Sequence, residues 1–134
     1  MRLGIALATT GLLFASTVWA EPNAVLYQLQ ERCGKTAAEV FRRDYENVTI
    51  KGAENWHFNY QAHYNAHLNK CFFLEISKSF EKNNTTSYRL FDLLENREYG
   101  GFSEINNYVF CNVLDTACMS KTEWDNLIKP YMEE

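Results

Sequence analysis

The sequence predicts an α+β domain with an N-terminal helix, an antiparallel meander of about four strands, and a short C-terminal helix. Three patterns indicate this order. Apolar residues recur at steps of three and four over residues 23–45, apolar and polar residues alternate strictly from His57, and a helix-capping sequence precedes Trp124. Because the strands form one run between two helices, we expect a single domain in which the helices cover the apolar face of the sheet.

The first twenty residues have the composition of a secretory signal peptide. One basic residue, Arg2, precedes an apolar run of mostly small residues that ends at Ala20. An uncleaved membrane anchor is the alternative, but Thr and Ser dilute the run, and a spanning helix needs about 20 apolar residues. We therefore predict cleavage after Ala20. This leaves one domain, residues 21–134, with no stable membrane insertion and with enough residues for a modest core.

The balance of charges argues against two classes of partner. Cleavage removes Arg2 from 13 basic residues, which oppose 17 acidic ones, and so moves the formal net charge from −4 to −5. Both signs are mixed along the chain without a basic stripe, so nucleic-acid binding lacks its electrostatic basis. Attraction to an anionic membrane surface lacks the same basis. The acidity suits a basic partner, although a mild net charge mainly confers solubility.

All four cysteines lie within the predicted mature domain, where export makes disulfides the expected state. They are Cys33, Cys71, Cys111 and Cys118. Three pairings exist, and we favour Cys111–Cys118, which are close in sequence, with Cys33–Cys71 as the remaining pair. A zinc site is the alternative, but the C-x2-C or H-x3-H spacing of such sites is missing. A redox role is weaker still, because the sequence holds no C-x-x-C.

The first predicted helix covers residues 23–45, with Asn23 as its N-cap. Its apolar stripe includes Leu26, Leu29, Cys33 and Ala37. Because Cys33 falls on this stripe, a bond to Cys71 would tie the helix to the sheet. Residues 46–55 break the helical period and are predicted to form a loop.

The central residues predict strands joined by turns. From His57 to Leu68 the apolar side chains occupy even positions and the polar ones odd positions, which is typical of a strand with one solvated face. A bend is expected within residues 65–70. Further strands are predicted at 71–80, 86–94, 99–102 and 108–113, separated by turns at 81–84 and 95–98. Gly100 and Gly101 indicate a bulge or a close backbone approach.

The last predicted element is a helix that begins near Lys121. Ser120-Lys121-Thr122-Glu123 has the form of a capping box. The apolar residues that follow are Trp124, Leu127, Ile128 and Tyr131. Pro130 is expected to end or kink this helix, and a Cys111–Cys118 bond would tie the last strand to the residues before it.

The three histidines are the first candidates for chemistry. His63 and His67 stand four residues apart, a spacing that would form a metal clip on a helix. On a strand they would lie about 13 Å apart, too far to share one ion unless a turn after Asn65 folds His67 back. We interpret both, and His57, as solvated side chains on the polar face of the sheet. A transition-metal site formed by the three is the alternative.

Catalytic signatures are missing from the sequence. The G-x-S-x-G motif of serine hydrolases does not occur, and one glycine pair is too little for a phosphate-binding loop. Two converging carboxylates would form a site of the glycoside hydrolase type, but no spacing in the sequence supports such a pair. The candidates are Glu75, Asp92, Glu95, Glu98 and Glu104. We predict no catalytic residue, no resident metal and no cofactor.

The chain is rich in aromatic residues, with eight Tyr, nine Phe and three Trp. Tyr60, Tyr64, Phe72 and Trp124 either fill the core or line a ligand groove or protein-binding face. We favour the core for these four. A second surface candidate is the polar cluster around the predicted bend, although asparagine there is typical of turns. Its members are His63, Asn65, Asn69 and Lys70.

Three segments carry a resemblance to a known group of proteins. They are His63–Phe72 (HYNAHLNKCF), Tyr99–Phe102 (YGGF) and Trp124–Leu127 (WDNL). With them, the chain resembles small exported bacterial proteins of uncharacterised function. The resemblance extends loosely over most of residues 21–134. It implies an exported, disulfide-containing domain and assigns no activity and no functional residue.

These observations predict a small periplasmic or secreted binding module for an envelope or extracellular protein or for a small ligand. An inhibitor of another protein is one concrete form of this hypothesis. The first alternative is a transition-metal-binding protein that uses the histidines, and the second is a small envelope hydrolase.

Overall fold

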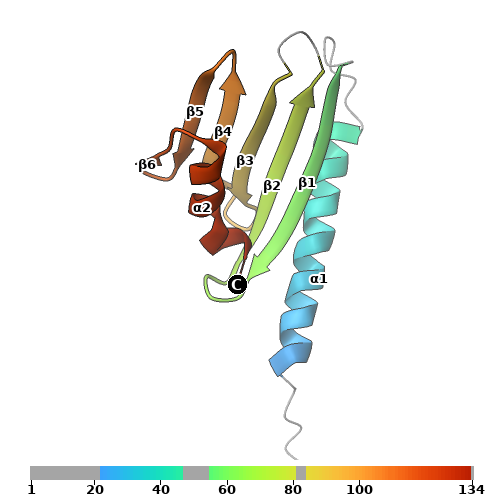
Figure 1. Cartoon of the computed structure of the whole chain (residues 1–134). Helices are drawn as coiled ribbons and strands as arrows, with labels where there is room; N and C mark the ends of the chain where they lie inside the picture. Colours follow the sequence, from blue (N-terminus) through green and yellow to red (C-terminus); the bar gives the residue numbers. More distant parts are fainter. Residues whose placement is uncertain (1–21, 47–54, 81–83, 134) are drawn as a thin grey trace, which may run out of the picture.

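The structure is a computed structural model, and it describes residues 22–46, 55–80 and 84–133. The predicted signal peptide lies outside these residues, as do residues 47–54 of the predicted loop at 46–55 and residues 81–83 of the predicted turn at 81–84. The chain is α+β, as predicted (Figure 1). No helix in the described part of the chain is long and apolar enough to span a bilayer.

The elements in order are α1 (Pro22–Phe41), the π-helix η1 (Arg42–Glu46), β1 (Trp56–Asn65), β2 (Lys70–Ser79), β3 (Thr86–Asp92), β4 (Arg97–Ile105), β5 (Tyr108–Val113), β6 (Thr116–Ala117) and α2 (Lys121–Met132).

The six strands form one antiparallel meander in sequence order, from β1 to β6. The prediction of about four strands was too low. Strand β4 has nine residues, rather than the four predicted at 99–102. Strand β6 has only two residues, both exposed, which pair with the end of β5. A segment of two exposed residues carries no alternating pattern, so β6 could not be found in the sequence.

The predicted bulge and close backbone approach are both present in β4. The register between β3 and β4 shifts between Leu90 and Phe91, which leaves Tyr99 as the extra residue of a β-bulge. A Cβ atom on Gly100 would lie 2.2 Å from the carbonyl oxygen of Asn112. Only glycine therefore allows β5 to pair this closely, and the bulge turns Tyr99 into the core beneath α2.

The two helices pack on opposite faces of the sheet. Neighbouring residues of a strand point to opposite faces. Cys71 of β2 is bonded to Cys33 of α1, whereas the ring of Phe72 lies 5.3 Å from that of Tyr131 in α2. The expectation of one apolar face covered by both helices is wrong, because β2 is an interior strand. Its residues from Cys71 to Glu75 are all buried, so both of its faces need cover.

Two hydrophobic cores result, one on each face. The larger lies beneath α2 and consists of Phe72, Leu74, Leu90, Tyr99, Phe102, Val113, Cys118, Trp124 and Ile128. The smaller lies beneath α1 and is built around Cys33, Tyr64 and Cys71. The core interpretation of Tyr64, Phe72 and Trp124 is confirmed by their burial. Tyr60 is half-buried, and its ring packs between those of Phe41 and Phe73.

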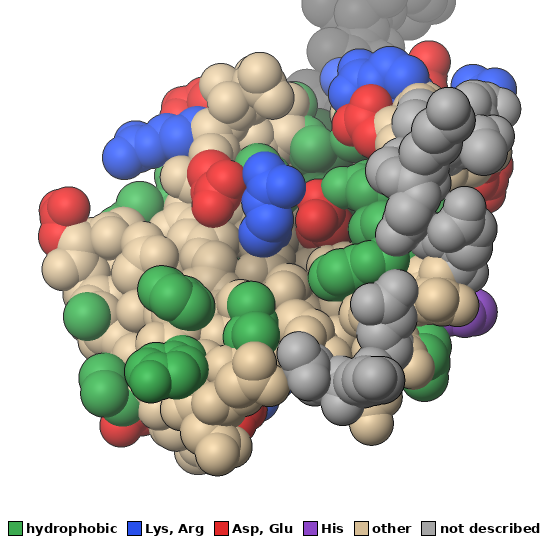
Figure 2. All heavy atoms as spheres, turned by 90° about the horizontal axis from the view of Figure 1, so that it is seen from above, with side chains coloured by type: hydrophobic (Ala, Val, Ile, Leu, Met, Phe, Trp, Pro, Cys, Tyr) green, Lys and Arg blue, Asp and Glu red, His purple; other side chains and the backbone are tan. Residues whose placement is uncertain are grey.

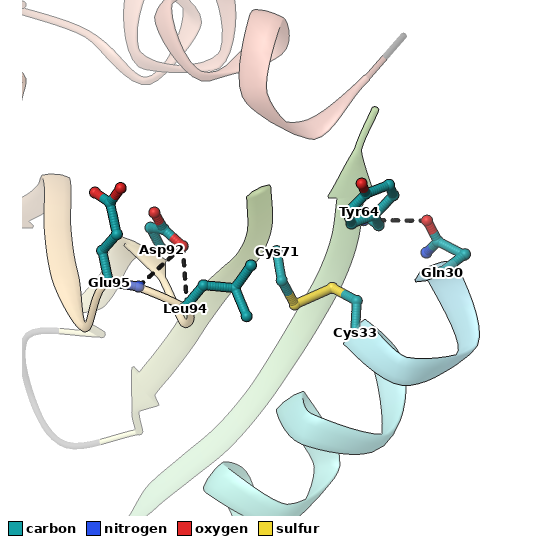
Figure 3. The surroundings of a disulfide bond; sticks show 7 residues. All are labelled: Gln30, Cys33, Tyr64, Cys71, Asp92, Leu94 and Glu95. Atoms are coloured by element: carbon teal, nitrogen blue, oxygen red, sulfur yellow. Dashed lines mark hydrogen bonds between the residues drawn. A yellow bond between two sulfur atoms is a disulfide. The ribbon is translucent and has the colours of Figure 1, made fainter. Parts of the chain in front are cut away.

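Helix α1 begins one residue earlier than predicted. Pro22 occupies the first helical position, which suits its fixed φ angle and missing N–H group, and Asn23 is therefore not the N-cap. Figure 3 shows the disulfide between Cys33 and Cys71 that joins the helix to the sheet. The Cα atoms of the two cysteines are 5.4 Å apart. Beside this disulfide, the Gln30 side-chain oxygen accepts a hydrogen bond of 3.1 Å from the backbone N–H of Tyr64. Because β1 is an edge strand, this bond satisfies an amide that could otherwise pair with another chain.

Helix α2 begins at Lys121, as predicted. The Ser120 hydroxyl accepts from the backbone N–H of Glu123 at 3.2 Å. The Glu123 carboxylate accepts from the N–H of Met119, one residue before the N-cap, at 2.7 Å. The helix ends two residues after Pro130.

The second disulfide joins β5 to the segment before α2. The Cα atoms of Cys111 and Cys118 are 4.9 Å apart, and the Cys118 N–H donates to the Cys111 carbonyl at 3.0 Å. The cysteine pairing is thus the one that the sequence favours.

We expect the two disulfides to contribute unequally to stability. The loop closed by Cys33–Cys71 spans 38 residues and that closed by Cys111–Cys118 spans 7. Loop-closure entropy then gives contributions of about 4 and about 2.5 kcal/mol. Urea unfolding of the Cys33→Ser/Cys71→Ser and Cys111→Ser/Cys118→Ser variants should show the larger loss for the first. Equal losses, or the reverse order, would contradict this assignment.

Candidate functional site

A groove lies between α2 and β1 because α2 crosses the sheet obliquely. At the start of the helix, the Lys121 ammonium lies 4.5 Å from the centre of the Tyr88 ring in β3. At its end, the Pro130 carbonyl accepts a hydrogen bond from Asn65 in β1. The helix thus meets β1 at Asn65 and leaves the beginning of β1 uncovered. The resulting cavity of about 690 Å³ falls within the range of small-molecule sites, about 300–1,000 Å³. We call it the α2–β1 groove.

One wall of the groove is a row of polar side chains on β1. His57, Asn59 and Gln61 occur at alternate positions, share one face of the strand, and are all exposed. The Asn59 side-chain oxygen accepts from the N–H of Tyr60 at 2.8 Å, which leaves its NH₂ group available. The Gln61 amide has no partner within the described parts of the chain, so this wall offers donors and an acceptor to a ligand.

The floor of the groove is apolar. Leu74 and Ile128 are only 5% and 7% exposed, so Ile76 and Met132, which are half-buried, supply more of the surface that a ligand can reach. Tyr88 also lines the groove, but the ammonium of Lys121 lies over its ring. The floor therefore offers aliphatic contacts and little open aromatic surface.

The second wall is a row of alternating charges on α2. Lys121, Asp125, Lys129 and Glu133 follow one another at intervals of four residues, and the pairs Lys121–Asp125 and Lys129–Glu133 have N–O distances of 2.5 and 3.5 Å. Both pairs are well exposed, so water screens them strongly. Across the groove, Lys78 has no ion-pair partner among the described residues. Sequence reasoning missed this wall, although the regular spacing of opposite charges was a signal for it.

A second cavity of about 660 Å³ adjoins the groove where Lys121 meets Tyr88, because both residues line both cavities. Its other lining residues are Asn84, Thr86, Phe102, Glu104, Asn106 and Asn107. Polar groups thus continue beyond the groove across the end of the sheet.

The structure separates the three histidines. His57 lies at the start of β1, His63 near its end, and His67 in the turn that follows. Within residues 22–46, 55–80 and 84–133, no three His, Cys, Asp or Glu side chains lie close enough to hold a metal ion. The metal-binding alternative therefore has no ligand set in this part of the chain.

His57 and His67 are exposed, as interpreted, whereas His63 is half-buried. The interpretation of His63 as solvated was wrong, because its side chain is half-buried and lines a small cavity together with Leu26 and Tyr27 of α1. Its buried Nε2 atom has no hydrogen-bond partner among the residues that the structure describes.

The asparagines of the polar cluster near the bend have structural roles. Asn65 is 2% exposed, and its side-chain NH₂ donates to the Pro130 carbonyl at 2.9 Å while its oxygen accepts from the Leu68 N–H at 3.0 Å. The last carbonyls of a helix lack partners within the helix, so Asn65 caps the C-terminus of α2. Asn69 adopts a φ of 53° and accepts from the Tyr64 hydroxyl at 2.6 Å.

Lys70 and Asp92 form a buried ion pair beside this turn. The Lys70 ammonium lies 2.6 Å from the Asp92 carboxylate and 2.7 Å from that of Glu95. Asp92 is fully buried, and its other oxygen accepts from the backbone N–H groups of Leu94 and Glu95, as Figure 3 shows. The hydrogen bonds to Asp92 and then to Glu95 raise the pKa of Lys70. Lys70 therefore stays charged at neutral pH, and its bonds to Asp92 and Glu95 hold the β3–β4 turn against β2.

Other carboxylates are engaged on the opposite face from the groove. Glu75 is 7% exposed and accepts a short hydrogen bond from the Tyr45 hydroxyl. Burial and then this bond raise the pKa of Tyr45. Arg89 lies between Glu75 and Glu98, at 3.8 and 3.2 Å. None of these groups lines the groove or the adjoining cavity, so they do not form a hydrolytic pair within it.

Part of the α1 side of the sheet is uncovered. Helix α1 contacts β1 and β2, and on β4 and β5 the side chains of Ile105, Tyr108 and Phe110 are 39%, 72% and 67% exposed. Figure 2 shows hydrophobic side chains gathered on the side of the molecule that carries β4 and β5. Sequence reasoning placed Tyr108 and Phe110 in a strand and left Ile105 outside one, and it did not identify the surface, because alternation does not reveal which face a helix covers.

No family model, curated protein or solved structure matches this chain. The assignment of function therefore rests on the geometry of the groove and of the uncovered face.

We expect Asp92→Ala to destabilise the fold by about 3 kcal/mol, because it removes the partner of a buried charge and the acceptor of the turn amides. Urea unfolding measures this loss. The control is Glu133→Ala, which breaks an exposed ion pair and should cost less than about 1 kcal/mol. Similar losses in the two variants would show that the Lys70–Asp92 pair does not hold the turn.

Proposed function

We propose that this chain is a small exported binding protein, periplasmic or secreted, and that the α2–β1 groove is its ligand site. The observation that carries the proposal is the groove itself, a cavity of about 690 Å³ in which the Asn59 NH₂ group and the Gln61 amide, without partners among the described residues, lie above an aliphatic floor. Ligand sites combine apolar surface with a few polar groups that orient the ligand. This combination supports the recognition of a small or narrow ligand.

The residues that line the groove support binding over nucleophilic catalysis. Among the described lining residues there is no serine, threonine or cysteine, and the acidic residues Asp125 and Glu133 are each paired with lysine. His57 has its ring against Phe80, with 5.0 Å between the ring centres. A hydrolytic site needs a nucleophile or activated water beside a general base, and the described groove residues do not form such a pair.

Export is supported by the two disulfides, which are typical of oxidising compartments. The signal-like residues 1–20 support the same location.

A second candidate function is the binding of another protein, including its inhibition, through the uncovered face of β4 and β5. The observation that favours it is the exposure of Tyr108 and Phe110 on neighbouring positions of one sheet face. Tyrosine and phenylalanine are enriched at protein interfaces.

Gln61→Trp should abolish ligand binding in the groove without unfolding the protein. Gln61 is an exposed strand residue that lines the groove, so a large side chain at this position occupies the cavity and leaves the cores intact. We would titrate ¹⁵N-labelled residues 21–134 with a fragment library and record amide shifts. Fragments that bind should perturb Asn59, Gln61 and Ile76, and these shifts should disappear in the variant.

Gln28→Trp is the matched control, because Gln28 is exposed on α1 and lines none of the described cavities. Binding should persist in it. Shifts that cluster instead at Tyr108 and Phe110 would favour the second candidate, and binding that survives Gln61→Trp would end the first.

The export proposal predicts that the full chain, produced in a bacterium, is recovered from the periplasm or medium without residues 1–20. Intact mass spectrometry should find Glu21 as the first residue and no free thiol, since all four cysteines are paired. A cytosolic product that retains Met1–Ala20 would contradict export.

A further inference from the structure

We infer that the ligand of the α2–β1 groove is an extended peptide that lies alongside β1, an inference that rests on the proposed binding function. The spacing of the polar wall carries this assignment. His57, Asn59 and Gln61 occupy alternate positions of a regular strand, so their side chains recur about every 6.6 Å. An extended peptide presents N–H and C=O groups to one side with the same repeat, because it has the same rise per residue.

The floor has a matching repeat. Leu74 and Ile76 pair with Gln61 and Asn59 in the register of β1 and β2, so each polar residue of the wall has an aliphatic residue beside it. A peptide whose backbone bonds to Asn59 and Gln61 would direct alternate side chains toward Ile76 and Met132. Small or aliphatic residues fit at these positions, since the exposed floor is narrow and Leu74 and Ile128 are almost fully covered.

The charged wall favours a peptide over a polyanion. Along α2 the charges alternate between lysine and acidic residues, about 6 Å apart in rise. The α2 wall carries two lysines and two acidic residues and is neutral as a whole, and Lys78 adds one positive charge on the other side of the groove. Such a wall can pair with peptide side chains of either sign. A polyanion would instead be repelled by the acidic residue at every second position of the wall.

The structure favours a peptide over a carbohydrate or a lipid chain. The Tyr88 and Phe58 rings that line the groove offer little surface to a sugar, because the Lys121 ammonium lies over Tyr88 and the Phe58 ring packs against Tyr45, 4.7 Å away between ring centres. A lipid chain needs an enclosed apolar cavity, and here one whole wall is polar. The peptide is also not an added strand at the edge of β1, since side chains already cap the N–H groups of Tyr60 and Tyr64 there.

The test begins with a random decapeptide library displayed on phage and panned against immobilised residues 21–134. Enriched peptides are then synthesised, and their Kd values are measured by calorimetry. Asn59→Ala or Gln61→Ala should each weaken binding about fivefold, and the double variant about thirtyfold, as expected for the loss of one or two hydrogen bonds. Gln28→Ala is the matched control and should leave Kd unchanged.

Methylation of the peptide backbone tests the repeat directly. Peptides carrying N-methyl groups at odd positions and at even positions are compared, and one set should lose binding while the other retains it. Equal effects of the two sets, or an unchanged Kd in the Asn59→Ala/Gln61→Ala variant, would overturn the peptide inference. So would a failure of panning to enrich any peptide.

The two proposals fail in different ways. Chitotetraose is titrated as the carbohydrate probe, alongside the fragments used above. Groove shifts that disappear in Gln61→Trp, with no peptide enriched, would overturn the peptide and leave the ligand site standing. If no probe of any class perturbs the groove, both proposals are wrong.

Discussion

Strand β2 holds the three layers of this protein together through two adjacent residues. Cys71 is bonded to α1, and Phe72 packs against α2 on the other face. Because neighbouring residues of a strand point in opposite directions, the two attachments act at nearly one point of the chain. Removing the cover from either face would expose large apolar side chains, so the placement of both helices follows from the burial of this one strand.

Incomplete cover is the source of both candidate binding surfaces. Six strands are too many for a helix of 20 residues and one of 12 to cover on both faces. Helix α1 lies along β1 and β2, which leaves Tyr108 and Phe110 exposed on β5. Helix α2 runs from Tyr88 in β3 to Asn65 in β1 and leaves an open region beside the first half of β1. The groove is thus a consequence of the crossing angle of α2.

The same type of side chain has opposite roles along one face of β1. Asn65 is buried and caps the last carbonyls of α2, whereas Asn59 and Gln61 keep hydrogen-bonding groups available to a ligand. Buried amides need partners, and exposed ones find them in water or in a ligand. Asn65 and Lys70 of the HYNAHLNKCF segment therefore have structural roles, one as the cap of α2 and the other as the partner of Asp92. Their polarity is explained by these roles and does not make them part of the binding site.

Local patterns were enough to predict most elements of this chain, though not β6. Alternation revealed β1, the capping box revealed the start of α2, and the closeness of Cys111 and Cys118 indicated their bond, because each of these signals depends on residues close in sequence. The bond between Cys33 and Cys71 followed as the remaining pair. Alternation also marked His57, Asn59 and Gln61 as a polar row. The burial of His63, the opposite placement of the helices and the closing of the groove by Lys121 and Lys129 depended on how distant elements pack. The crossing of a helix over a sheet is set by contacts between residues far apart in the chain, so no local pattern records it.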